Sequence, residues 1–302
     1  MLGSSQRGGQ VASNSDCLDL VGLPQLMART SGTPEISIGL IDGPVALDHP
    51  DLAAENIREV PAKLVGACAN ARDAACTHGT FVTGVLLARR GSAAPAICPG
   101  CSLLVRPIFA EASANGEQMP SASAAELAEA IFDVIRAGAR VINLSVALQG
   151  QSPRGAHSLQ EALDLALHRG VVVVAAAGNQ RAVGSSVITG HPGVISVIAY
   201  DLRGRPMDSS NLGSSIGRRG LGAPGEAVTS LGVTDPQTLG GTSVATPFVT
   251  GAVALIWSEF PGATAAAVRS AITQAAAPRR TTIVPPLLNA WAGHRAMSES
   301  RR

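Results

Sequence analysis

Short apolar runs alternate with amphipathic segments along most of the chain. The runs typical of buried strands cover residues 35–42, 101–109, 140–146, 171–179 and 194–200. Helix-like segments lie between them, among them residues 77–90 and 124–137. This alternation is typical of parallel strands joined by helices that cover both faces of a sheet. The pattern therefore predicts an α/β fold.

Particular residues predict two helix boundaries. The apolar stripe over residues 124–137 ends at Gly138, a residue typical of helix C-termini. Ser158 followed by Glu161 matches a capping box, in which each side chain binds a backbone N–H of the first turn. This pair predicts the start of a helix that ends before Gly170.

The segment GGTSVATPFVTGAVALIWSEF, residues 240–260, predicts a buried helix whose first turn contains Ser243. Pro247 is expected near the helix start, where backbone N–H groups have no partner within the helix. Ser243 or Thr242 could simply cap this helix. Alternatively, Ser243 is a nucleophile, placed where free N–H groups and the positive helix end stabilise an oxyanion. A serine nucleophile also needs a base, and the base needs an orienting acid.

Length and linker composition indicate one domain. The chain has 302 residues, which is long for a single domain but sufficient for one full core. No repeat and no long low-complexity linker divides it. We expect a loosely structured segment over residues 1–30, a single domain over residues 31–290 and a tail over residues 291–302.

Composition and charge narrow the class of partner. The net charge of +1, from 23 basic and 22 acidic residues, argues against nucleic acid and against a polybasic membrane contact. A peptide or a small neutral molecule is the expected partner. No apolar run is long enough to span a membrane, and the N-terminus lacks the apolar core of a signal peptide. We therefore expect a cytoplasmic protein.

The five cysteines, Cys17, Cys68, Cys76, Cys98 and Cys101, leave three arrangements open. An odd number without an export signal favours free thiols. The last four could instead bind zinc, although structural zinc sites normally use two close pairs. In an oxidising environment, two local disulfides are favoured over zinc.

Four chemically useful side chains are expected at one edge of the sheet. Asp42 and Asn179 lie at the ends of predicted strands, whereas His78 and Ser243 begin predicted helices. In an open α/β sheet, functional groups gather at the carboxyl ends of the strands. Singly, each residue has an ordinary explanation as a turn, cap or core residue. Together they supply an acid, a base, a nucleophile and an amide donor, and that combination indicates a catalytic site.

The motifs around these residues resemble those of the subtilisin-like serine protease family. GLIDGPV surrounds Asp42, HGTFVTG begins at His78 and GGTSVATPFVTGAVAL surrounds Ser243, in the chain order of that family. VVVVAAAGN resembles the strand that leads to the family's oxyanion-hole asparagine, here Asn179. The resemblance covers about residues 36–277. It implies a three-layer subtilisin-like fold, with a mostly parallel central sheet and helices on both faces.

The resemblance also implies a role for each residue. Ser243 would attack the scissile carbonyl, His78 would take and return the proton, and Asp42 would orient His78. Asn179 and the Ser243 backbone N–H would donate to the oxyanion. No cofactor is implied.

The same resemblance implies substrate contacts by strand addition, in which the peptide pairs with an edge strand. The residues that resemble this edge strand are Ser145, Val146 and Ala147. Those that resemble a wall of the pocket for the residue before the cut are Ala175, Ala176, Ala177 and Gly178.

Some positions depart from the family pattern. Gly43 and Pro44 follow the acid, Gly241 stands where members often have serine, and Phe248 stands where they often have histidine. None of these departures removes a catalytic group. The Arg-rich residues 88–100 lack the Asn and Asp ligands of the calcium loop common in secreted members, so we expect no metal there.

LIDGPVALDHPDL and CPGCSLLVRPIF most resemble the precursor-peptide proteases of cyanobactin-type ribosomal peptide biosynthesis, which remove a leader from a modified precursor. A related macrocyclase carries a helical insertion between its acid and its histidine. The span from Asp42 to His78 leaves little space for one, so hydrolysis is expected. A general intracellular protease remains an alternative. A peptide-binding pseudoprotease would predict a broken triad, whereas this triad is complete.

Overall fold

The structure, a computed structural model, describes residues 13–61, 68, 73–109, 122–145, 153–275 and 282–300. Among these residues, seven strands form one sheet in the order β2-β3-β1-β4-β5-β6-β7, and each neighbouring pair is parallel. The strands are β1 (Ser37–Asp42), β2 (Ile57–Glu59), β3 (Ser102–Pro107), β4 (Val141–Leu144), β5 (Val172–Ala176), β6 (Val194–Tyr200) and β7 (Leu221–Pro224). A separate antiparallel pair is formed by β8 (Val228–Ser230) and β9 (Gln237–Leu239).

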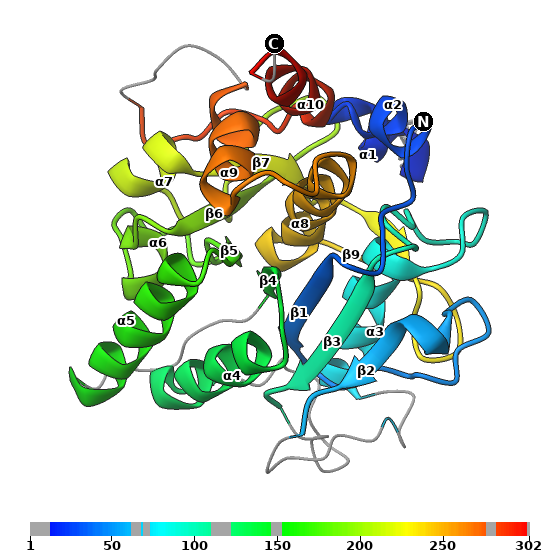
Figure 1. The fold of residues 1–302 in the computed structure, drawn as a ribbon, viewed down its shortest axis with the longest axis horizontal. Helices are drawn as coiled ribbons and strands as arrows, with labels where there is room; N and C mark the ends of the chain where they lie inside the picture. The colour runs from blue at the N-terminus through cyan, green and yellow to red at the C-terminus, as the bar shows by residue number, and fades with distance from the viewer. Residues whose placement is uncertain are drawn as a thin grey trace, which may run out of the picture.

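Helices cover both faces of the sheet (Figure 1). The long ones are α3 (Ala74–Leu87), α4 (Ala124–Arg136), α5 (Pro153–His168) and α8 (Thr242–Glu259). Leu103 and Val105 of β3 pack in the apolar core with α3 and α8, whereas Leu104 packs with α4 and α5. Successive side chains of a strand point to opposite faces, so a strand buried on both sides fills two layers of core. The predicted three-layer α/β fold with a parallel sheet is confirmed.

The described terminal segments form a further group of helices, which lie near one another in Figure 1. They are α1 (Asn14–Leu20), α2 (Leu23–Met27), α9 (Ala265–Gln274) and α10 (Ala290–Glu299). Cys17, Leu23 and Leu26 are completely buried, and the Ala290 N–H donates to the Val21 carbonyl oxygen at 2.8 Å. The expectation of loose structure over residues 1–30 is therefore wrong for the described residues 13–30. Residues 291–299 likewise belong to α10 and do not form a tail.

One predicted helix boundary is wrong. The helix predicted to start at Ser158 is α5, which begins at Pro153, well before Ser158. Ser158 therefore lies inside the helix, and Glu161 forms an ion pair with His157 at 3.3 Å instead of closing a capping box. Proline is favoured in the first turn of a helix because it needs no hydrogen-bond partner there. The strand expected over residues 194–200 is confirmed as β6. The remaining short elements are η1 (Ala54–Asn56), α6 (Val187–Gly190) and α7 (Ser214–Arg219).

The strand order places the ends of β1 and β5 at the same edge. β1 lies between β3 and β4, the point at which the chain changes direction across the sheet. In sheets of this kind, ligands bind beside the carboxyl ends of the strands at that point. Asp42 is the last residue of β1, and Asn179 follows β5. The carboxyl edge of the sheet is therefore where a site is expected.

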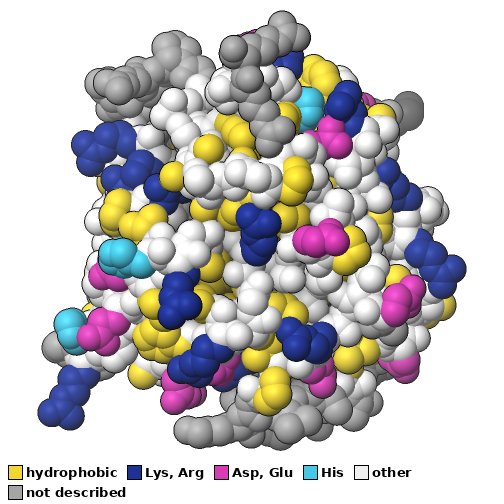
Figure 2. All heavy atoms as spheres, viewed as in Figure 1, with side chains coloured by type: hydrophobic (Ala, Val, Ile, Leu, Met, Phe, Trp, Pro, Cys, Tyr) yellow, Lys and Arg dark blue, Asp and Glu magenta, His cyan; other side chains and the backbone are white. Residues whose placement is uncertain are grey.

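The surface seen in Figure 2 carries acidic and basic side chains interspersed with one another, in agreement with the net charge of +1. No helix in the described ranges is long and apolar enough to cross a membrane.

The cysteines divide into two groups. Cys68 and Cys76 form a disulfide, whereas Cys17, Cys98 and Cys101 are buried free thiols. The expectation of free thiols is therefore wrong for one pair. A four-thiolate zinc site is also contradicted, because two of its four sulfurs are bonded to each other. In the described part of the chain, no group of three or more His, Cys, Asp or Glu residues could hold a metal ion.

Candidate active site

Asp42 and His78 form a buried ion pair at the carboxyl edge of the sheet. Asp42 Oδ1 lies 2.7 Å from His78 Nδ1 and also accepts the Gly43 N–H at 2.7 Å. The Asp42 residue is 0% exposed and His78 is 6% exposed. A carboxylate so deeply buried requires a partner, and the His78 ring provides it.

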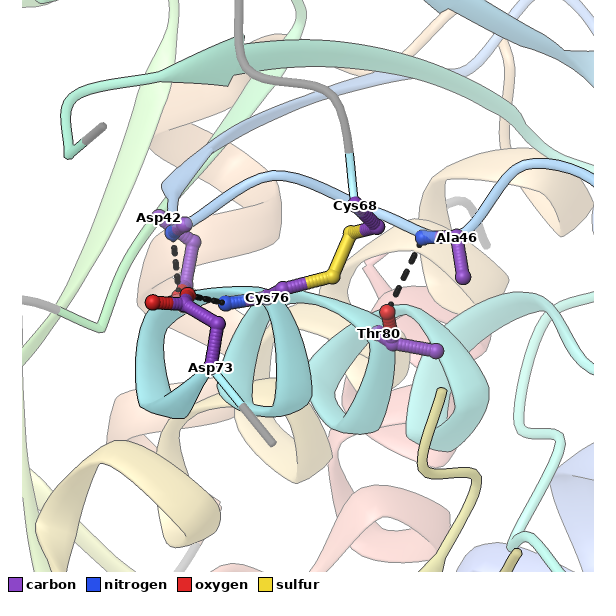
Figure 3. The surroundings of a disulfide bond; sticks show 7 residues. Asp42, Ala46, Cys68, Asp73, Cys76 and Thr80 are labelled. Carbon is purple, nitrogen blue, oxygen red and sulfur yellow. Dashed lines mark hydrogen bonds between the residues drawn. A yellow bond between two sulfur atoms is a disulfide. The ribbon is translucent and has the colours of Figure 1, made fainter. Parts of the chain in front are cut away.

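Several local contacts lie at the start of α3, the helix that carries His78 (Figure 3). Asp73 caps the helix by accepting the Cys76 N–H at 2.8 Å, and the disulfide joins Cys76 to Cys68. Thr80 Oγ1 accepts the Ala46 N–H at 3.0 Å and so ties α3 to the loop after β1. The Asp73 cap and the disulfide act on the first turn of α3, and the Thr80 contact ties the next turn to the loop after β1.

Gly43 permits the close approach of β1 and α3. A Cβ atom at this position would overlap the carbonyl oxygen of Ala75, in the first turn of α3. Only glycine avoids that overlap without moving the helix. The departure from the family pattern at Gly43 is therefore explained by packing.

Ser243 completes the group of side chains at the start of α8. His78 Nε2 lies 3.0 Å from Ser243 Oγ, and Ser243 is partly exposed. The N-cap residue is Gly241, with φ of 121°, and it has no side chain that could cap the helix. The interpretation of Ser243 or Thr242 as a simple cap is therefore contradicted.

A buried polar network holds Ser243 from below. Pro247 lies inside α8, later than expected, and it lacks the N–H that would bind the Ser243 carbonyl oxygen. The Ser145 hydroxyl donates to that oxygen instead, at 3.1 Å. Asn143 Nδ2 donates to Ser145 Oγ at 2.8 Å, and Thr250 Oγ1 donates to Asn143 Oδ1 at 2.7 Å. Asn143 and Thr250 were not predicted from the sequence, because no local motif marks a contact between a strand and a distant helix.

Asn179 faces the same helix start from the end of β5. Its Oδ1 accepts the Thr242 N–H at 3.0 Å, and Thr242 Oγ1 accepts the Gly178 N–H at 3.2 Å. With Oδ1 bound to the backbone, Nδ2 is the atom of this amide that can donate to a ligand beside Ser243.

Electrostatics favour a charged His78. Burial of the ring disfavours the proton, but the Asp42 charge and hydrogen bond outweigh burial and raise the pKa of His78 above its ordinary value of 6.5. An imidazole in this position can take the Ser243 proton and is stabilised as an imidazolium. The arrangement can therefore perform nucleophilic acyl transfer.

The predicted substrate contacts are described only in part. Val146 and Ala147 lie outside the described residues, and Ser145 is buried beneath Ser243. Of the predicted pocket wall, Ala175 and Ala177 are buried in apolar clusters. Ala176 and Gly178 are the partly exposed members of that wall.

Comparison with protein families and curated proteins gives clear matches. The family model of the Subtilase family matches residues 33–294. Subtilisin DY from Bacillus licheniformis is 30% identical over 270 residues, which cover 86% of this chain and 90% of that protein. Subtilisin E from Bacillus subtilis (strain 168) is 30% identical over 259 residues, which cover 84% of this chain and 63% of that protein.

Solved structures with a similar fold include peptide-maturation enzymes. A point mutant of the protease domain of PatA gives a TM-score of 0.79 at 30% identity, covering 89% of this chain and 97% of that one. Prenylagaramide maturation protease PagA gives 0.77 at 28% identity, covering 91% and 98%. The PatG macrocyclase domain, at 23% identity and a TM-score of 0.76, covers 92% and 96% and shares the fold.

Proposed function

We propose that this chain, which belongs to the subtilase family and is a serine endopeptidase, removes the leader from a ribosomally made precursor peptide through a triad of Asp42, His78 and Ser243. The observation that carries the triad is the continuous path of contacts from the Asp42 carboxylate through His78 to the Ser243 hydroxyl, at 2.7 and 3.0 Å.

Each residue has a defined role in the reaction. His78 Nε2 accepts the Ser243 hydroxyl proton while Oγ attacks the scissile carbonyl carbon, and His78 then gives the proton to the leaving amine. Asp42 stabilises the imidazolium through Nδ1. Asn179 Nδ2 and the Ser243 backbone N–H donate to the oxyanion. Water then attacks the acyl-enzyme by the same proton route in reverse.

Two solved structures support the precursor-processing role. PagA is named a prenylagaramide maturation protease. PatA is named a patellamide maturation protease, and the matched structure is that of its protease domain. Both match most of this chain at 28–30% identity. A general protease is the second candidate, since subtilisin DY matches at the same identity over 90% of its length.

Cleavage-site mapping separates the two candidates. The protein is incubated with leader–core precursor peptides of ribosomal peptide pathways and with a library of unstructured peptides, and the products are identified by mass spectrometry. Leader removal predicts one cut at the leader–core junction and little cleavage of the library. Broad cleavage of the library at comparable kcat/KM would favour the general protease. The Ser243→Ala variant controls for contaminating proteases.

The pocket for the residue before the cut is proposed to prefer a medium-sized uncharged side chain. Small residues such as Ala176 and Gly178 leave room for an apolar group, whose burial contributes about 25 cal/mol per Å². Gln180 and Arg181 are exposed beside this wall, and the guanidinium would repel Lys or Arg. The measurement is kcat/KM for matched peptides with Leu, Ala, Glu or Lys before the cut. A preference for Lys would contradict the proposed specificity of the pocket but not the proposed triad.

A further inference from the structure

Asn211, in the loop between β6 and α7, uses its whole side-chain amide to bind the loop that carries Asn179. Its Oδ1 accepts the Gln180 N–H at 3.0 Å and the Ala182 N–H at 2.9 Å. Its Nδ2 donates to the Ala177 carbonyl oxygen at 3.0 Å and to Gln180 Oε1 at 2.7 Å. An asparagine amide has two acceptor and two donor positions, so all four are filled.

The backbone around Asn211 continues the same contact. The Asn211 N–H donates to the Gly178 carbonyl oxygen at 2.8 Å, and the Leu212 N–H donates to that of Ala182 at 2.9 Å. Gly178 has a φ of 101°, and a Cβ atom there would overlap Asn211 Nδ2. Gly178 is therefore needed both for the turn and for the approach of Asn211.

Apolar packing contributes little to this loop. Asn179, Gln180, Arg181 and Ala182 are exposed, and Val183 is 72% exposed. A loop with so little buried apolar surface has low local stability unless hydrogen bonds hold it. Besides the contacts to Thr242 at the start of α8 and those to Asn211, two backbone hydrogen bonds hold the loop: the Arg181 N–H donates to the Ser209 carbonyl oxygen at 3.0 Å, and the Leu212 N–H donates to that of Ala182 at 2.9 Å.

We propose that Asn211 is a positioning residue for oxyanion stabilisation, holding residues 177–182 so that Asn179 Nδ2 is directed at the developing oxyanion. This inference rests on the proposed role of Asn179. Oxyanion donors act only when they lie within about 2.7–3.1 Å of the oxygen, and a misplacement of about 1 Å can cost about 100-fold in rate. Asn211 fixes the flanking peptides on both sides of Asn179.

The first test compares Asn211→Leu with Asn289→Ala. Leucine has nearly the same size but forms none of the four hydrogen bonds. Asn289 caps α10 by accepting the Ala292 N–H at 2.9 Å, so its loss lowers Tm at a distance from the site. At a temperature where both variants are folded, Asn211→Leu should lower kcat on the order of 10- to 100-fold, with KM within about twofold. Asn289→Ala should retain kcat. If Asn211→Leu does not fold, Asn211→Asp tests the two donor contacts alone, because it keeps both acceptor contacts, and it should also lower kcat.

The second test asks whether Asn211 acts through Asn179. A peptide aldehyde bonds to Ser243 Oγ and places its oxygen in the oxyanion position, whereas the matching peptide alcohol does not. Asn211→Leu should raise the inhibition constant of the aldehyde by about the same factor by which it lowers kcat. The inhibition constant of the alcohol should stay unchanged. In the Asn179→Ala background, Asn211→Leu should have little further effect on kcat.

Three outcomes would overturn the inference. They are an unchanged kcat in Asn211→Leu, an equal loss of affinity for the aldehyde and the alcohol, or a double variant whose loss of kcat is the product of the two single losses. The proposed function fails separately, if Ser243→Ala retains wild-type turnover or Asn179→Ala keeps full kcat.

Discussion

The two sides of the candidate site are held by different means. The acid–base side, Asp42 and His78, is buried and is fixed by a strand, a capped helix and a disulfide. On the oxyanion side, Asn179, Gln180, Arg181 and Ala182 are exposed, and residues 177–182 are held by hydrogen bonds to side-chain amides, a hydroxyl and neighbouring backbone. A buried charge pair needs a protected, rigid setting, whereas a donor that meets the substrate must remain accessible. Loss of a donor on the oxyanion side should therefore affect mainly the rate, whereas loss of a structural contact on the acid–base side should affect mainly the stability.

Ser243 joins the two sides, and its loss should have the largest effect. Ser243→Ala removes one oxygen from a partly exposed position and should lower kcat about 10⁶-fold with Tm nearly unchanged. His78→Ala should lower kcat by a similar factor, because residues that act as one unit are not additive. Single-turnover kinetics of both single variants and of the double variant check this. A double variant much slower than either single variant would contradict joint action.

Asn179→Ala tests the oxyanion side alone. Loss of one oxyanion donor should lower kcat about 10²- to 10³-fold. Tm should fall only slightly, because the side chain is exposed and the described structural bond lost with it is the one from the Thr242 N–H. Michaelis–Menten kinetics and thermal unfolding of the same preparation are the measurements. A rise in KM at constant kcat would assign Asn179 to substrate binding instead.

The disulfide tests the acid–base side. Cys68→Ser opens a cross-link between residues eight positions apart and should lower the free energy of unfolding by about 2–3 kcal/mol, because the unfolded chain gains freedom. Where the variant is folded, kcat should be close to that of the wild type. Urea unfolding with and without a reductant is the measurement. Reductant should lower the free energy of unfolding of the wild type and leave that of the variant unchanged. An equal decrease in both proteins would mean that the reductant acts on a sulfur other than those of this disulfide.

The pH dependence gives the smallest expected effect and concerns the same side. His78 must be neutral to accept the serine proton, and its pKa lies above 6.5. Activity should therefore fall as the pH drops through a midpoint above 6.5. Asp42→Asn removes the charge that raises this pKa, so the midpoint of its residual activity should move to lower pH. The pH profile of kcat/KM for both proteins checks the direction of the shift. An unchanged midpoint would show that Asp42 does not raise the pKa of the group that titrates.

Local sequence motifs were enough to predict some site residues, whereas residues placed by contacts between distant parts of the chain could not be predicted. Asp42, His78 and Ser243 each lie within a contiguous motif, so their neighbourhood was readable without the fold. Asn143 binds Thr250 across 107 positions, and no local signal marks such a pair. The partners of Asn211 lie about 30 positions before it in the chain, beyond any local pattern.

The errors have physical causes as well. The Ser158 prediction failed because the capping pattern also occurs within helices. The N-terminal prediction failed because Cys17, Leu23 and Leu26, scattered among polar residues, find apolar partners only in the folded core.

The wide separation of the site residues bears on how the protein is made. His78 and Ser243 are 165 positions apart, and Ser243 opens a helix that ends at Glu259. At the usual 5–20 residues per second, the ribosome adds Ser243 about 10–30 s after His78. During that interval the nascent chain carries the proposed acid and base without the proposed nucleophile. With the proposed triad, a partial chain that lacks Ser243 would have no hydrolytic activity, and activity would appear only after α8 has emerged and packed.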